Sequence, residues 1–142
     1  MPHMPTRDLA GTWSYRAFLN DPDLETPFDK LRFATARLTL TQSGGALRGS
    51  LAGEGWGTWI DWSLDLEGRA EAGGFRLQGR NVIQGDEWAY DYAGAFAPTW
   101  PHATDARDVI TGTVIRSKDR QTVPGARGVH ATFVAIKTSK ET

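Results

Sequence analysis

Hydrophobic and polar residues alternate along most of the chain, which is the period expected of strands with one buried face. In residues 33–41, Leu38 and Leu40 alternate with polar neighbours, and residues 57–69 repeat the pattern over a longer run. Short segments rich in glycine separate these runs. The pattern predicts about eight strands, at 9–19, 33–41, 47–53, 57–69, 75–83, 87–96, 109–116 and 129–137.

Tight turns join several of the predicted strands directly. The segments at 43–45, 72–74 and 84–86 each contain glycine, which supplies the backbone conformation of a short hairpin turn. Sequential antiparallel strands lose their free edges when they close into an up-and-down barrel. We therefore predict an all-β fold, an antiparallel barrel of about eight strands. A two-sheet sandwich is the alternative, but it requires longer crossovers between sheets.

Two segments interrupt the strand pattern. Thr26 resembles a helix N-cap, with Pro27 at the first helical position and Asp29 in the first turn, so we expect one short helix near 26–33. The segment at 97–108 contains two prolines, which a central strand excludes, and is predicted to be a long loop.

Composition narrows the class of protein. The 142 residues suit one barrel domain, assigned to 6–138, with 1–5 and 139–142 as disordered termini. A formal charge of −1 argues against a nucleic-acid or membrane partner, and the absence of cysteine excludes disulfides and thiolate metal sites. The N-terminus lacks a signal-peptide pattern, so we expect a cytoplasmic protein; a secreted chain whose signal had been removed would look the same.

Aromatic side chains share one face of the strand predicted at 87–96. Trp88, Tyr90 and Tyr92 alternate there, so all three point to the same side of the sheet. A buried tyrosine hydroxyl needs a hydrogen-bond partner, and two on one strand favour a polar group within an otherwise apolar cavity. A filled aromatic core is the alternative.

We expect a ligand pocket around these three rings at the open end of the barrel. The loop at 97–108 follows the same strand and carries Trp100, which would close over the mouth, and His102, which would fix a polar atom of the ligand. Tyr15 and Phe133, on the first and last strands, would complete the wall. The histidines have no metal-ligand spacing and no cofactor motif occurs, so no metal or cofactor is predicted.

The two ends of the chain resemble those of a known superfamily. Gly11-Thr12-Trp13 at the start of the first strand resembles the Gly-x-Trp opening of the calycins, which include the lipocalins and the avidin group. The run at 129–137 is similar to the closing strand of avidin-like barrels. The resemblance implies that Trp13 plugs the closed end under a cation from a late strand, either Arg116 or Lys137.

The avidin ligand site is not matched by this sequence. The hairpin expected to present a tyrosine and a serine to biotin contains Leu47, Arg48, Gly49, Ser50 and Leu51. The resemblance therefore implies the fold and a general binding role, and it does not extend to biotin.

The sequence does not decide between three functions. The first is a non-catalytic protein that binds a small apolar or aromatic molecule in the barrel. The second is an isomerase or cyclase in which Tyr90, Tyr92 or His102 polarises a carbonyl group. The third is a structural or interaction protein with a filled barrel, which an enclosed cavity would argue against.

Trp59 suggests self-association. On a strand it faces opposite to Trp56 and Trp62, which leaves it on the outside of the barrel. An exposed tryptophan commonly marks a subunit contact, so a homodimer through an outer barrel face is expected. A ring lying flat against the sheet is the alternative.

Overall fold

Eight strands and one short helix form the described part of the chain. The computed structural model describes residues 8–20, 24–53, 62–83, 85–98, 107–117 and 128–138. In chain order the elements are β1 (Gly11–Leu19), η1 (Phe28–Leu31), β2 (Arg32–Ser43), β3 (Ala46–Gly53), β4 (Ser63–Glu71), β5 (Gly74–Ile83), β6 (Asp86–Phe96), β7 (Val109–Arg116) and β8 (His130–Lys137).

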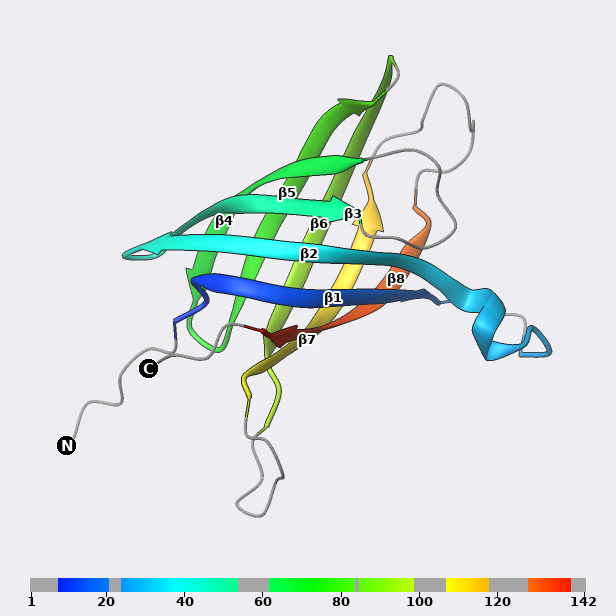
Figure 1. The fold of residues 1–142 in the computed structure, drawn as a ribbon, viewed down its shortest axis with the longest axis horizontal. Coiled ribbons are helices and arrows are strands. Elements are labelled where there is room, and N and C mark those ends of the chain that lie inside the picture. The colour runs from blue at the N-terminus through cyan, green and yellow to red at the C-terminus, as the bar shows by residue number, and fades with distance from the viewer. Residues whose placement is uncertain are drawn as a thin grey trace.

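The strands close into a barrel (Figure 1). Each strand pairs antiparallel with the next, and β8 returns to pair with β1, aligning Lys137 with Trp13 and Phe133 with Ala17. Closure pairs the backbone groups that an open sheet would expose at its edges. The predicted fold class is confirmed: an all-β, up-and-down barrel of eight antiparallel strands. The sandwich alternative is wrong.

The strand bounds agree with the predicted ones to within about two residues, except at the start of β4. The sequence predicts that this strand begins at residue 57, whereas β4 begins at Ser63. Residues 57–61 lie outside the described residues. At its other end β4 continues to Glu71, where a tight turn leads into β5.

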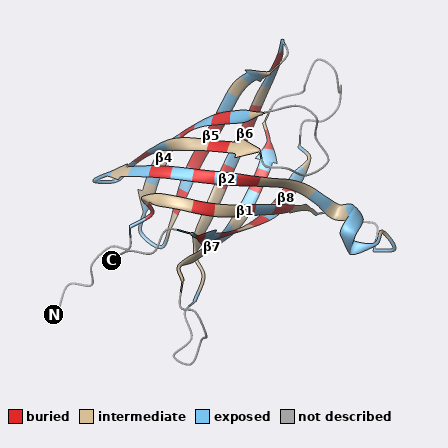
Figure 2. Cartoon of the chain, viewed as in Figure 1, coloured by how far each residue is buried: buried red, intermediate tan, exposed pale blue. Residues whose placement is uncertain are grey.

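Alternation along the strands separates an interior from an exterior (Figure 2). On β2, Leu38 and Leu40 are buried while Arg37 and Thr39 are exposed. The other strands repeat this pattern, so leucine and aromatic side chains line the interior and most charged side chains face outward; Arg116 and Lys137 are buried exceptions. Burying each large apolar side chain contributes about 1.5–3 kcal/mol. The period-two sequence pattern is therefore the direct cause of the barrel's single core.

The predicted helix is present as one turn of 3-10 helix, η1, but it begins differently from the prediction. Pro27, rather than Thr26, occupies the N-cap position, and no side chain caps the turn. The Pro27 carbonyl accepts a 2.9 Å hydrogen bond from the Lys30 N–H. Phe28 stacks on Phe18 of β1, with 4.9 Å between ring centroids. This turn packs on the barrel wall through Phe28 and has no side-chain cap.

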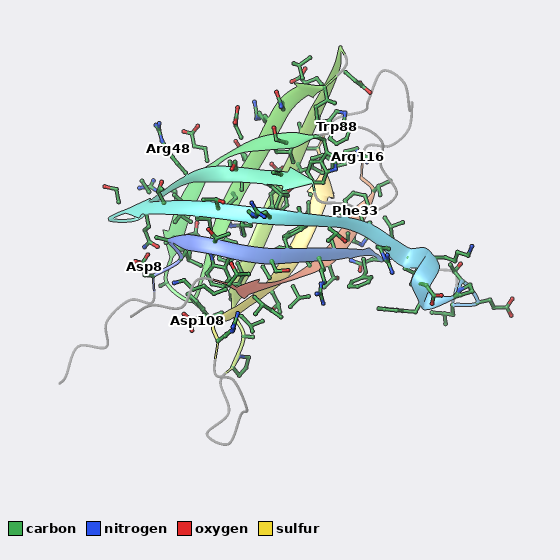
Figure 3. All side chains as sticks on the ribbon, viewed as in Figure 1. Asp8, Phe33, Arg48, Trp88, Asp108 and Arg116 are labelled. Atoms are coloured by element: carbon green, nitrogen blue, oxygen red, sulfur yellow. The ribbon has the colours of Figure 1, made fainter. Side chains whose placement is uncertain are left out.

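Strand direction defines two ends of the barrel. The turns between β2 and β3 and between β4 and β5 lie at one end, which we call the Trp13 end. The turn between β5 and β6 lies at the other, which we call the Arg116 end. In Figure 3, Asp8 and Asp108 mark the Trp13 end, and Phe33, Trp88 and Arg116 gather at the opposite end.

The Trp13 end is filled by side chains. Trp13 has no exposed surface, and its Nε1 donates a 3.0 Å hydrogen bond to the Leu9 carbonyl. The Lys137 Nζ lies 5.6 Å from the centroid of the indole, and the Phe96 ring lies 6.3 Å away. The expected contact between Trp13 and a late-strand cation is confirmed for Lys137. The Arg116 alternative is wrong, because Arg116 ends β7 at the opposite end of the barrel.

Candidate functional site

A cavity of about 280 Å³ lies inside the Arg116 end. Its wall is mostly aromatic, and among the described residues that line it one carries a charge, Arg116. The rings come from Tyr15, Phe33, Trp62, Trp88, Tyr90 and Tyr92, and the aliphatic surface comes from Ala34, Leu51 and Leu64. An apolar wall with a few polar groups is the usual form of a small-molecule site.

Small interior residues leave room for this cavity. Interior positions of β1 and β2 toward the Arg116 end hold Ala17 and Ala34, whereas the same strands supply Trp13 and Leu40 toward the other end. A closed eight-stranded barrel is just wide enough for packed side chains, so alanine at interior positions opens space. The barrel is therefore filled at one end and hollow at the other.

Glycine allows one wall of the cavity to form. The Gly53 N–H donates a 2.9 Å hydrogen bond to the Trp62 carbonyl. A Cβ atom added at Gly53 would overlap the Trp62 indole, so this ring can lie against β3 only because position 53 has no side chain. The Trp62 ring then reaches Trp88, with centroids 6.0 Å apart.

Three aromatic side chains of β6 face the cavity together, as predicted from their alternation. Trp88 is half-buried, whereas Tyr90 and Tyr92 are 5% and 6% exposed. Trp88 meets Tyr90 edge-on at 6.4 Å, and Phe33 from β2 meets the same ring at 6.3 Å. The rings support one another, so the wall is preformed.

Arg116 and Tyr90 form the polar centre of the site. They are directly paired across β6 and β7. The Arg116 Nε and Nη2 donate hydrogen bonds of 3.1 and 3.0 Å to the Tyr90 hydroxyl oxygen, and the guanidinium carbon lies 5.3 Å from the centre of the ring. Because the oxygen accepts both bonds, the hydroxyl proton remains available to a third group.

Arg116 has no counter-charge in the described part of the chain. Arg116 is 9% exposed. Within the described residues, no carboxylate lies at salt-bridge distance from it, and the Tyr90 hydroxyl accepts all of the hydrogen bonds that its side chain makes. Burying an ionised group costs several kcal/mol unless a partner compensates for the lost water.

Two further tyrosine hydroxyls lie in the cavity wall. Tyr15 is 2% exposed and Tyr92 is 6% exposed, and within the described ranges neither hydroxyl has a hydrogen-bond partner. Burial, with a smaller contribution from the nearby Tyr90, raises the pKa of Tyr15 well above its ordinary value. Burial also raises the pKa of Tyr92, with Tyr15 and Tyr90 adding to the shift. Both groups are therefore neutral hydrogen-bond donors at physiological pH.

The structure brings together four of the seven predicted ligand-binding residues: Tyr15, Trp88, Tyr90 and Tyr92 line one cavity. Phe133 is not among the lining residues; it faces the barrel core and its ring stacks on Tyr15 with 5.3 Å between centroids. Phe133 thus supports the Tyr15 ring from within the core.

Trp100 and His102 lie outside the described residues. The chain before and after them is described, because β6 ends at Phe96 and β7 begins at Val109. The Ala97 N–H donates a 2.8 Å hydrogen bond to the Val109 carbonyl, so both ends of this loop meet at the Trp13 end. Trp88, by contrast, lies near the start of β6, at the Arg116 end.

Sequence reasoning missed Arg116 as a cavity residue. The signal was present, because β7 alternates and Arg116 shares the inward phase of Ile110 and Val114. A cation at an inward position of a barrel strand indicates a polar group in the interior. The resemblance to calycins instead predicted that Arg116 could lie beside Trp13, so the sequence analysis gave it no place in the cavity.

The described residues hold neither a cluster of metal-ligating side chains nor a membrane-spanning helix. No group of three or more histidine, cysteine, aspartate or glutamate side chains there is arranged to hold a metal ion. In the same ranges, no helix has the length and apolar character needed to cross a membrane.

Comparison with known proteins gives no family for this chain. No protein-family model matches the sequence, and no curated protein matches it.

Proposed function

We propose that the protein binds a small, largely apolar organic molecule in the cavity at the Arg116 end, without catalysing a reaction. The single observation that carries the proposal is a cavity of about 280 Å³ with aromatic walls, in a barrel whose other end is filled. A cavity of about 150 Å³ holds one benzene molecule, so this one suits roughly two fused rings or a ring with a short chain.

Two further observations support a binding role. The opening Gly11-Thr12-Trp13 resembles the calycin barrels, and the contact between Trp13 and Lys137 has the form which that resemblance implies. The cavity lies at the end opposite this plug, which is where a calycin-like barrel would be open. A structural protein with a filled barrel would not need such a cavity.

The tyrosine hydroxyls favour binding over catalysis. A general acid works best when its pKa lies near the operating pH, and burial moves the pKa values of Tyr15 and Tyr92 away from that range. The isomerase or cyclase alternative retains one supporting observation: Arg116 holds the Tyr90 hydroxyl in position, where it could polarise a carbonyl group. Product analysis after prolonged incubation with a bound compound distinguishes the two functions.

Tryptophan fluorescence tests the proposal, because Trp62 and Trp88 both line the cavity. A panel of planar aromatic and polyketide-like compounds is titrated into the wild-type protein. We expect saturable quenching by some members, and a smaller signal in Trp88→Phe.

A pair of matched variants provides the control. Ala34→Phe introduces a ring into the cavity and should abolish binding, whereas Ala93→Phe adds the same ring on the outward phase of β6 and should leave binding unchanged. If no compound binds wild type, or if Ala34→Phe binds as well as wild type, the proposed function is wrong.

A further inference from the structure

The guanidinium of Arg116 is equipped to hold a negatively charged group. Its Nε and one N–H of Nη2 point to the Tyr90 oxygen, which leaves both N–H groups of Nη1 and the second of Nη2 with no acceptor in the described part of the chain. The side chain is nevertheless buried in the wall of an apolar cavity. Hydrogen bonds between charged groups are about twice as strong as neutral ones and are strengthened in surroundings of low polarity, so these donors would favour an anion.

The surrounding donors reinforce this preference. Tyr90 accepts two hydrogen bonds from Arg116 and can donate its own proton, while Tyr15 and Tyr92 present hydroxyls with no other partner in the described ranges. All of these groups can donate to an acceptor. In the same ranges, the cavity wall contains no carboxylate that would repel an anion.

We propose that the ligand carries one carboxylate group and that Arg116 and Tyr90 bind it, with an aromatic or alicyclic body lying between Trp62, Trp88 and Phe33. This inference rests on the proposed function and names the class of its ligand. The guanidinium is planar and matches the two oxygens of a carboxylate. A single buried cation balances a single negative charge, which favours a carboxylate over a doubly charged phosphate monoester.

Three probes of equal ring size test the charge preference. Calorimetric titration compares 2-naphthoate, 2-naphthamide and 2-naphthyl phosphate on the wild-type protein. We expect naphthoate to bind at least about tenfold more tightly than the uncharged amide, because the difference is one charge-assisted pair of hydrogen bonds. The phosphate should bind more weakly than naphthoate, because its second charge has no partner.

Variants assign the preference to one side chain. Arg116→Gln should weaken naphthoate binding about tenfold or more and leave naphthamide nearly unchanged, and Arg116→Lys should fall between, since a charge remains without the planar fork. Tyr90→Phe should weaken naphthoate severalfold. Arg80→Gln removes the same charge from an exposed position on β5 and should change nothing. Circular dichroism verifies the fold of each variant.

The outcomes separate this inference from the proposed function. Equal affinity of wild type for naphthoate and naphthamide overturns the carboxylate assignment while a binding cavity remains. Loss of naphthoate affinity in Arg80→Gln to the same extent as in Arg116→Gln overturns it as well, because the effect would then follow net charge. If none of the three naphthyl probes binds while another compound of the panel does, the carboxylate assignment is overturned as well. Failure of every compound overturns the proposed function, and the inference with it.

Discussion

Both ends of the barrel place a cation against an aromatic ring, yet one end is solid and the other is hollow. At the Trp13 end, the Lys137 Nζ lies 5.6 Å from the indole centroid; at the Arg116 end, the guanidinium carbon lies 5.3 Å from the centroid of Tyr90. The side chains around each cation determine whether that end of the barrel is filled or hollow. The Trp13 ring occupies the interior and its Nε1 donates a hydrogen bond to the Leu9 carbonyl, whereas the small Ala34 at the Arg116 end leaves the polar groups facing a cavity.

The largest expected effect is at the solid end. Trp13→Ala removes a fully buried indole and should destabilise the protein by about 3–5 kcal/mol, enough to unfold much of it. Urea denaturation measures the loss. Trp88→Ala is the counterpart at the hollow end and should cost much less, because Trp88 is half-buried and borders a cavity. Near-wild-type stability of Trp13→Ala would show that Trp13 is not the plug.

The two cations should respond differently to an apolar replacement. Lys137→Met loses the contact with the Trp13 ring and should destabilise the protein by about 0.5–2 kcal/mol. Arg116→Met removes a buried charge that has no counter-charge among the described residues and should leave stability unchanged or raise it. Thermal denaturation of both variants checks this. A larger loss from Arg116→Met than from Lys137→Met would contradict the ligand-binding role given to Arg116.

Alkaline pH should destabilise the protein through two tyrosines in the wall of the hollow end. The folded-state pKa values of Tyr15 and Tyr92 are raised above the unfolded value of about 10, so the folded protein retains protons that the unfolded chain releases. The stabilisation is complete below about pH 10 and is lost as the pH rises from there toward the raised values. Urea midpoints at increasing pH measure the slope, and Tyr92→Phe should flatten it. An equally steep slope in Tyr92→Phe would argue against this origin.

The smallest effect on stability is expected at Trp59, in the segment that joins β3 to β4. Trp59 lies outside the described residues, and the prediction rests on the sequence pattern alone. If it anchors a homodimer, wild type sediments as a dimer at micromolar concentration and Trp59→Glu as a monomer, with stability changed by no more than about 0.5 kcal/mol. If the wild-type protein sediments as a monomer, the predicted homodimer does not form.

The fold could be predicted because its signals are local. Alternation places Leu38 and Leu40 inside, and glycine turns such as Gly44, at φ +59°, join neighbours in sequence order. The start of η1 was predicted wrongly because a threonine before a proline resembles an N-cap, while this turn packs through Phe28.

The site was less predictable because it depends on register and strand direction. The pairing of Tyr90 with Arg116 crosses from β6 to β7, and alternation gives no register across a long loop. Phe33 and Trp62 lie at or beyond strand ends, where alternation carries little information. β6 runs from the Arg116 end toward the Trp13 end, so Trp88 and the loop that holds Trp100 are at opposite ends of the strand. A single sequence does not give the register, whereas the separation of Trp88 from the loop follows from its place near the start of the strand.

The seam between β1 and β8 has a consequence for the order of folding. Every other strand pair joins strands that are consecutive in the sequence. β1 and β8, which place Trp13 opposite Lys137, come from the two ends of the chain. Contacts between distant residues form slowly because the intervening chain must be closed first. The Thr138 N–H bonds to the Thr12 carbonyl at 2.8 Å, so the first and last described segments already lie side by side. A circular permutant opened at Gly73, with residue 138 linked to residue 8, would turn the seam into a hairpin and move the slow step to the new opening between β4 and β5.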